Sequence, residues 1–342
     1  MTNSLLYEDA HLQCIHQPGS RTDALIVTFG EMMMRPYPQP TIWAGEPIGK
    51  LDLPAIGFVG KRQNWYPEAS VRSALNAAGP LLDSAERRIG YGFSMGAWAV
   101  LKYGRDFRLD VALSFSPQYS IDPDVIADRR FTQYFDPALN HGMEIAAGDG
   151  AALNILACDP HDAGDRESAE RIMAVIDARL VRLDNLGHGS VKCVTRTKTL
   201  ERIFDACLTG DAEAIAHSIR AARRFGEARP QTIANAIVAR KPATAFAIYC
   251  KYRDLFPVAH RPAFLYKLRR SIFREACFEE LTALSGTLGE TPGFLAVRAE
   301  FLHDMGQSDE ARQSILRAIA IRDLPSYQFL LRKFSEATDA VR

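Results

Sequence analysis

The sequence lacks several features that would assign it to a class directly. Its 6 cysteines are scattered with no CxxC pair, which is typical of reduced thiols rather than of a disulfide framework or a zinc site. The 41 basic residues balance the 41 acidic ones, so no net charge draws the chain to nucleic acid or to an anionic membrane. No GxxxxGK[ST] or GxGxxG phosphate loop occurs, and we expect no nucleotide cofactor.

Membrane-spanning and export signals are also missing. No run of about 18 consecutive apolar residues occurs. Residues 1–14 carry acidic side chains where a signal peptide needs a basic and then an apolar run. The apolar fraction of 47% is that of a globular protein with a sizeable core. We therefore expect a cytoplasmic protein whose partners are small neutral or weakly charged molecules.

The chain changes in character near residue 195. Before that point, β-rich runs alternate with helical stretches, which predicts an α/β domain with a mostly parallel sheet and helices on both faces. The expected strands are 24–29, 55–60, 88–93, 111–116, 153–158 and 178–183. After it, Ala, Arg, Leu and Glu recur at helical spacing. We predict an α/β domain over 1–195 and an all-helical domain over 198–342.

The helical part carries a weak internal repeat. Small and apolar residues occur at the spacing of a tetratricopeptide repeat at Leu295, Ala299, Leu302, Gly306, Ala311, Ile315 and Ala318. Upstream, Ala245, Tyr249 and Pro257 take the corresponding places, and Ala245 precedes Ala311 by 66 residues (311 − 245). The segment resembles a tetratricopeptide array, which implies stacked helix pairs and a surface for a protein partner. A plain helical bundle is the alternative.

The stretch from Gly92 to Gly96, GFSMG, is a GxSxG motif between a predicted strand and a predicted helix. Both glycines are needed where the turn is so tight that side chains two residues from the serine would collide with their neighbours. The strand RRIGYGF, Ser94 and the helix MGAWAVLKYG resemble the nucleophile elbow of the α/β-hydrolase superfamily. The resemblance implies an α/β-hydrolase-like sheet with Ser94 as the nucleophile.

The same resemblance implies a histidine and an acid in the chain order Ser, Asp or Glu, His. His188 lies between two glycines in the loop after the expected strand 178–183, and we predict that it is the general base. Its alternative is an ordinary loop histidine beside a turn.

Three aspartates after the expected strand 153–158 compete for the role of the acid. Asp162 is preferred, because it lies four residues beyond the strand end and would point back across the sheet edge. Asp159 is expected to cap the strand end. Asp165 is expected to N-cap a helix that begins near Arg166.

Acyl transfer also needs donors for the developing oxyanion. One is expected to be the backbone N–H of Met95, at the positive end of the helix. The second is expected from Glu31, with Gly30 forming the turn after strand 24–29. Members of the superfamily commonly carry His-Gly or a run of glycines there, so this loop departs from the pattern.

Four residues follow strands at the rim where ligands gather in parallel sheets. The candidates for substrate binding are Asn64, Trp65, Tyr66 and Gln118. Flat aromatic faces combined with hydrogen-bond donors suit a sugar or another polar substrate. A surface loop with one anchoring aromatic is the alternative for 60–67.

These observations predict a serine hydrolase without a large lid that cleaves an ester or thioester through Ser94, His188 and Asp162. Its expected substrate is a small acyl ester or an acylated glycan, and the chemistry requires no metal or organic cofactor. Two alternatives stay open. One is an acyltransferase that uses the same residues, and the other is an inactive hydrolase-like protein that binds a partner through its helical domain.

Overall fold

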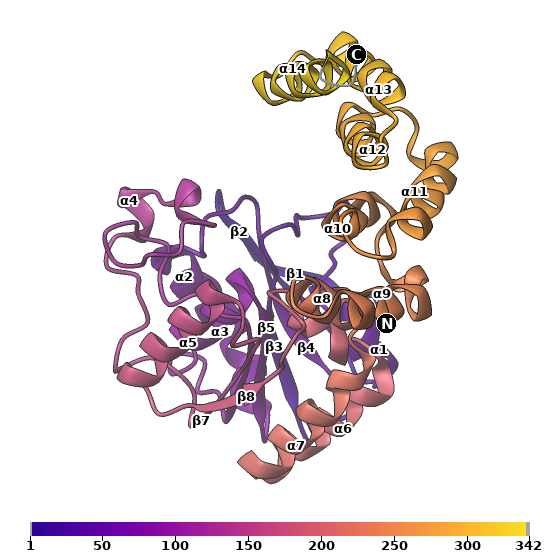
Figure 1. Cartoon of the computed structure of the whole chain (residues 1–342). Helices are drawn as coiled ribbons and strands as arrows, with labels where there is room; N and C mark the ends of the chain where they lie inside the picture. Colours follow the sequence, from indigo (N-terminus) through magenta and orange to yellow (C-terminus); the bar gives the residue numbers. More distant parts are fainter. Residues whose placement is uncertain (1, 340–342) are drawn as a thin grey trace. The chain divides into compact units, whose positions relative to one another are not determined.

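The computed structural model describes residues 2–339 (Figure 1). The chain divides into two compact units, Met1–Glu227 and Ala228–Arg342. The first contains a mostly parallel sheet of eight strands with helices, and the second is helical. The predicted α/β fold followed by a helical region is therefore confirmed.

The sheet of the first unit has the strand order β1-β2-β4-β3-β5-β6-β7-β8. The strands are β1 Ser4–Glu8, β2 Leu12–Gln17, β3 Leu25–Phe29, β4 Ala55–Gly60, β5 Arg88–Phe93, β6 Val111–Phe115, β7 Leu153–Cys158 and β8 Arg179–Arg182. The strands from β4 to β8 along this order run parallel, whereas β1 and β2 are antiparallel to their neighbours. Strands β1 and β2 were not predicted from the sequence, because β1 is a largely exposed edge strand and β2 mixes polar with apolar residues.

Helices cover both faces of this sheet. One face carries α2 (Glu68–Ser84), α3 (Met95–Lys102) and α5 (Ala163–Val175), and the other carries α1 (Gly45–Lys50), α6 (Thr197–Thr209) and α7 (Ala212–Ala222). Successive residues of a strand point to opposite faces, so Val27 and Phe29 of β3 enter one core and Ile26 enters the other. Strands buried on both faces are near-continuous apolar runs, which made β3 to β7 predictable, whereas the sixth predicted strand, β8, is a partly exposed edge strand.

The first unit extends past the boundary expected at 195–198. Leu200, Ile203 and Phe204 of α6 are buried against the same sheet face as α1. Without α6 and α7 that face would expose its apolar side chains to water, so the two helices belong to the sheet. The division falls between Glu227 and Ala228.

The first unit also contains short elements. These are α4 (Pro137–Asn140) and the 3-10 turns η1 (Thr132–Tyr134), η2 (Ser190–Val194) and η3 (Arg223–Phe225).

The second unit is a succession of helices. They are α8 Arg229–Ile237, α9 Pro242–Lys251, α10 Arg261–Leu268, α11 Arg274–Leu288, α12 Pro292–Asp304, α13 Ser308–Ile321 and α14 Pro325–Asp339, with the 3-10 turns η4 (Arg253–Leu255) and η5 (Val258–His260). Leu295 and Ala299 of α12 and Ala311 of α13 are buried in one cluster, and Gly306 between the helices has a φ of 80°. The small residues thus allow this helix pair to approach closely, while the relation to tetratricopeptide repeats stays a prediction.

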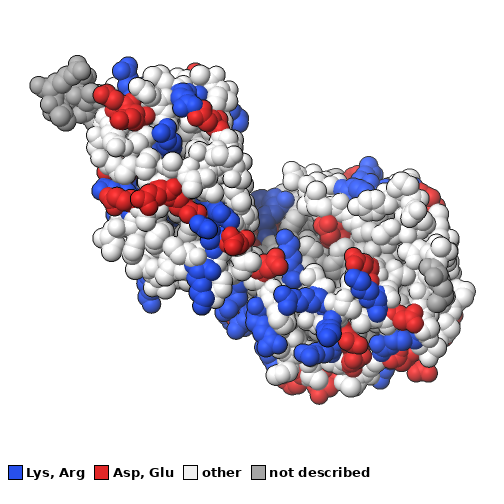
Figure 2. All heavy atoms as spheres, turned by 90° about the vertical axis from the view of Figure 1, so that its right-hand side faces the viewer, with Lys and Arg blue, Asp and Glu red and all other residues white. Residues whose placement is uncertain are grey.

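The surface carries both signs of charge side by side. Figure 2 shows Lys and Arg interspersed with Asp and Glu over the visible face, in keeping with the 41 residues of each sign. Among the residues described, we find no helix with the length and apolar character that crossing a membrane requires.

Candidate active site

Ser94 occupies the turn between β5 and α3. Its φ of 53° lies in the left-handed region that residues other than glycine seldom adopt. Its N–H donates to the Phe115 carbonyl at the end of β6 (2.9 Å), and its carbonyl accepts the N–H of Trp98 in α3 (3.0 Å). These bonds hold Ser94, which is 3% exposed, at the carboxyl end of the central strands.

Close backbone contacts require both glycines of this turn. A Cβ on Gly92 would lie 2.5 Å from the carbonyl oxygen of Gly96. A Cβ on Gly96 would lie 2.2 Å from the carbonyl oxygen of Phe29, at the end of β3. The absence of both side chains therefore lets β5 turn directly into α3 and brings the first turn of α3 against the end of β3.

His188 reaches Ser94 from the loop that follows β8. Its Nε2 atom lies 3.0 Å from the Ser94 Oγ atom. The rings of Phe93 and Phe131 pack against the imidazole, with centroids 5.3 and 5.5 Å from its own. The His188 side chain keeps 25% of its surface exposed, so solvent and a ligand can reach it. The structure thus brings the predicted serine and histidine together.

The carboxylate that contacts His188 belongs to Asp165 and not to Asp162. Asp165 Oδ1 lies 2.7 Å from His188 Nδ1, and the Asp165 side chain is 1% exposed. Asp162 is instead the N-cap of α5, where its carboxylate accepts the Asp165 N–H at 3.0 Å. The preference for Asp162 is corrected accordingly. Because α5 begins at Ala163 rather than near Arg166, the cap falls on Asp162 and Asp165 lies within the first turn.

Asp159 anchors the loop that carries His188. Its Oδ2 atom accepts the Gly187 N–H at 2.7 Å, and its Oδ1 atom accepts the N–H of His161 at 3.0 Å. The buried Asp159 carboxylate thus ties the end of β7 to the loop after β8. The three aspartates of one short segment therefore have three different roles.

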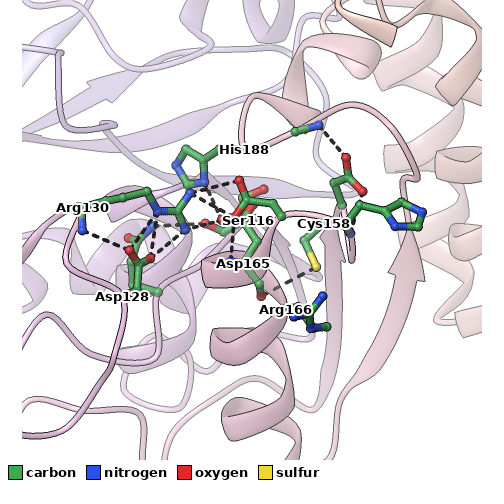
Figure 3. Close-up of polar contacts among 12 residues, drawn as sticks. Ser116, Asp128, Arg130, Cys158, Asp165, Arg166 and His188 are labelled. Carbon is green, nitrogen blue, oxygen red and sulfur yellow. Dashed lines mark hydrogen bonds and ion pairs between the residues drawn. The ribbon is translucent and has the colours of Figure 1, made fainter. Parts of the chain in front are cut away.

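Arg130 adds a positive charge beside the acid (Figure 3). Its Nη2 atom lies 2.9 Å from Asp165 Oδ1, the same oxygen that faces His188. Burial raises the pKa of the Asp165 carboxyl, but His188 and Arg130 outweigh burial and hold that pKa below its ordinary value of 3.8. Burial lowers the pKa of Arg130, but hydrogen bonds to Asp128 and Asp165 outweigh it and raise that pKa.

Arg130 was not predicted from the sequence. It lies in an irregular segment after β6 and is 35 residues from Asp165 in the chain, so no strand, helix or spacing pattern connects the two.

The expected oxyanion donors lie on two sides of the elbow. Met95 is the first residue of α3, and the first N–H groups of a helix have no acceptor within it. The Gly30 N–H donates to the Phe58 carbonyl at 2.8 Å, and its carbonyl accepts the Tyr66 hydroxyl at 2.7 Å. Gly30 is thus committed to the sheet and the turn, which leaves Glu31 as the candidate donor of this loop.

Asn64 and Tyr66 lie in the interior and not on the rim where the substrate was expected. The Asn64 amide donates to the His11 carbonyl at 3.0 Å, and its oxygen accepts the Tyr66 N–H at 3.1 Å. The Tyr66 hydroxyl is bound to Gly30. These polar groups already have partners that shape the loop after β4.

Trp65 is buried as well, and it contacts Phe131, one of the two phenylalanine rings that pack against His188. Its ring packs against Phe131 and Tyr134, with centroids 5.8 and 6.0 Å away. Because Phe131 in turn contacts His188, Trp65 supports the position of Phe131. Among the contacts described, Trp65 has none with Ser94.

Gln118 is the predicted substrate residue that contacts Ser94. Its Nε2 atom lies 3.3 Å from Ser94 Oγ and 3.3 Å from the Ser116 carbonyl oxygen. Because a carbonyl only accepts hydrogen bonds, the Ser116 contact determines which end of the amide is the donor. The Oε1 atom is buried and has no hydrogen-bond partner among the residues described. Gln118 therefore presents a donor to the serine oxygen.

No family model matches the chain. No curated protein matches it either. Similar solved structures include the capsule O-acetyltransferase of Neisseria meningitidis serogroup A, which is 14% identical with a TM-score of 0.38 over 64% of this chain and 92% of that one. Est1E from Butyrivibrio proteoclasticus is 13% identical with a TM-score of 0.40 over 63% and 100% of the two chains. Mouse alpha/beta hydrolase domain-containing protein 10 is 13% identical with a TM-score of 0.40 over 60% and 99%.

Proposed function

We propose that this chain is a serine hydrolase of the α/β-hydrolase type that cleaves an ester or thioester. One observation carries the proposal. Ser94 Oγ, the two ring nitrogens of His188 and Asp165 Oδ1 form a continuous hydrogen-bonded row with distances of 3.0 and 2.7 Å. A nucleophile, a base and an acid that orients the base are the groups that activate a serine.

The proposed reaction follows from the positions of these atoms. Ser94 Oγ attacks the carbonyl carbon while its proton passes to His188 Nε2. Asp165 accepts the Nδ1–H, which keeps Nε2 free to take the proton, and it stabilises the imidazolium that forms. The intermediate collapses when the leaving alcohol or thiol takes that proton. Water, activated by His188, then releases the acyl group from Ser94.

The negative charge that develops on the carbonyl oxygen needs preorganised donors. We assign this role to the Met95 N–H at the positive end of α3 and to the Glu31 N–H after β3. The close contact between Gly96 and the Phe29 carbonyl supports this pairing, since it brings the two segments together. The amide of Gln118 adds a donor at 3.3 Å from the nucleophile oxygen.

Acyl transfer to an alcohol is a second candidate reaction for the same residues. The rings of Phe93 and Phe131 against His188 favour it, because an acceptor hydroxyl must meet His188 in a site that excludes water. The partially exposed imidazole favours hydrolysis. Product analysis with an activated acyl ester, with and without a sugar or polyol acceptor, separates the two reactions.

A fluorophosphonate probe tests the proposal. We expect a covalent adduct on Ser94 in the wild type, located by mass spectrometry, and no adduct in Ser94→Ala or His188→Ala. Ser84→Ala, at the exposed end of α2, is the matched control and should label like the wild type. A folded wild-type protein without an adduct would contradict the proposal and favour a binding protein that has lost activity.

A further inference from the structure

Three carboxylates converge on one guanidinium next to the proposed catalytic residues (Figure 3). Arg130 Nη2 lies 2.7 Å from Asp128 Oδ2 and 2.9 Å from Asp165 Oδ1, and Nη1 lies 3.2 Å from Asp162 Oδ1. The Asp128 and Asp165 side chains are almost fully buried, whereas Arg130 keeps 34% of its surface exposed. Arg130 is thus the cation that allows three negative charges to lie together.

We propose that Arg130 is a positioning residue, which holds Asp165 against His188 and adjusts the charge that the imidazole experiences. This inference rests on the proposed function of Ser94, His188 and Asp165. Its direct support is that one carboxylate oxygen, Asp165 Oδ1, contacts both the guanidinium and the imidazole.

Shared contact with one oxygen has a geometric consequence. The guanidinium is planar and its donors have a fixed arrangement, so a carboxylate bound to it has little freedom to rotate. Asp162 and Asp128 fix Arg130 in turn, through its Nη1, Nε and Nη2 atoms. The orientation of Asp165 is therefore set from two sides, by the backbone of α5 and by Arg130.

The electrostatic consequence depends on every charged group near Asp165. These are His188 from the loop after β8, Arg130 and Asp128 from the loop after β6, Asp162 and Asp159 from the turn before α5, and the Cys158 thiol of β7. Arg130 is the permanent cation that contacts Asp165 directly. Without it, Asp165 would face two uncompensated carboxylates, and a buried carboxylate that loses its partner is strongly disfavoured.

The sign of the effect on His188 follows. The negative charge of Asp165 favours protonation of the imidazole, and the positive charge of Arg130 opposes it. Arg130→Gln should therefore favour the protonated imidazole and move the pH dependence of Ser94 labelling to higher pH. Asp128→Asn removes a negative charge from the same cluster, so it should move that pH dependence to lower pH. A purely structural role would produce no such reversal.

The test is an NMR titration of the His188 ring in the full chain, with the signal assigned by its loss in His188→Gln. We expect an upward shift in Arg130→Gln, a smaller one in Arg130→Lys, which keeps the charge, and a downward shift in Asp128→Asn. Arg129→Gln is the matched control, because the Arg129 guanidinium contacts the Pro123 carbonyl, and its titration should superimpose on that of the wild type.

The rate of fluorophosphonate labelling between pH 5 and 9 gives the functional readout. We expect Arg130→Gln to label about threefold more slowly at pH 7 and to need higher pH for half-maximal rate. Unchanged midpoints in Arg130→Gln and Asp128→Asn would overturn the inference.

Circular dichroism shows whether each variant is folded. If Arg130→Gln is not folded, Arg130→Lys and Asp128→Asn decide the question in the same way. A wild type that does not label would refute the proposed function, whereas the NMR titration would still test the coupling.

Discussion

Asp165 Oδ1 lies 2.7 Å from His188 Nδ1, although Asp165 stands in the first turn of α5 and His188 in the loop after β8. The two segments meet because β7 and β8 are adjacent and parallel, so the chain after each strand emerges at the same edge of the sheet. A buried carboxylate at this distance fixes the ring tautomer and leaves Nε2 for Ser94.

Replacing the acid tests which aspartate supports His188. Asp165→Asn keeps the shape but cannot hold the same tautomer, so we expect ester hydrolysis to fall by roughly 10⁴ in kcat. Asp162→Asn keeps a good N-cap and should retain activity within about threefold. Steady-state kinetics with an activated ester compare the two variants. Equal losses in both would contradict the assignment.

Removing the Asp159 carboxylate should release the loop that carries His188. The bond from the Gly187 N–H to Asp159 Oδ2 is 2.7 Å long, and charge-assisted bonds of this kind are stronger than neutral ones. Asp159→Ala should lower kcat and leave the amide of Gly187 free to exchange with solvent faster. Hydrogen exchange at residues 184–190 measures this change. Unchanged exchange would show that the loop is held by other contacts.

The Gln118 amide should contribute to the rate more than to binding. Its Nε2 atom lies 3.3 Å from Ser94 Oγ, the oxygen that gains negative charge as it loses its proton during the proposed reaction. Gln118→Ala should lower kcat by about 10² with little change in KM, the size expected for one lost donor. Steady-state kinetics on one ester separate the two parameters, with Ser120→Ala as the control in the same segment. A change confined to KM would assign Gln118 to substrate binding instead.

Gly96 should not tolerate a side chain. A Cβ there would lie 2.2 Å from the Phe29 carbonyl oxygen, so Gly96→Ala should lower the free energy of unfolding by about 1–3 kcal/mol. Gly79→Ala in α2 is the control, since its Cβ meets nothing within 4 Å and alanine favours a helix. Urea unfolding followed by tryptophan fluorescence reports on the first unit, which contains all 3 tryptophans. An equal effect of the two substitutions would contradict the contact.

Asp165 should make the unfolding free energy of the first unit depend on pH in the acidic range. Its pKa in the folded chain lies below the ordinary 3.8, so the charged carboxylate stabilises the fold above that pH. This contribution is lost as the pH falls through the lowered pKa. The difference in unfolding free energy between wild type and Asp165→Asn should therefore shrink between pH 6 and pH 3. Urea unfolding at several pH values measures it, and a constant difference would contradict the lowered pKa.

The sequence alone determined the elements whose signal is local. The five strands β3 to β7 are apolar runs because both faces of each are buried, and the two glycines around Ser94 are required by a turn within five residues. The glycine-flanked loop of His188 is a local feature as well. These predictions depend on neighbours in the chain, so the residue order was sufficient.

Only the tertiary structure decided the relationships between distant segments. The start of α5 at Ala163 places Asp165 rather than Asp162 against His188, and the fold of the loop after β6 brings Arg130 to the same oxygen. The burial of Asn64 and Tyr66, and the packing of α6 and α7 on the sheet, arise in the same way. Such contacts depend on where the chain returns in space, and a shift of one helical turn changes which carboxylate faces a neighbour.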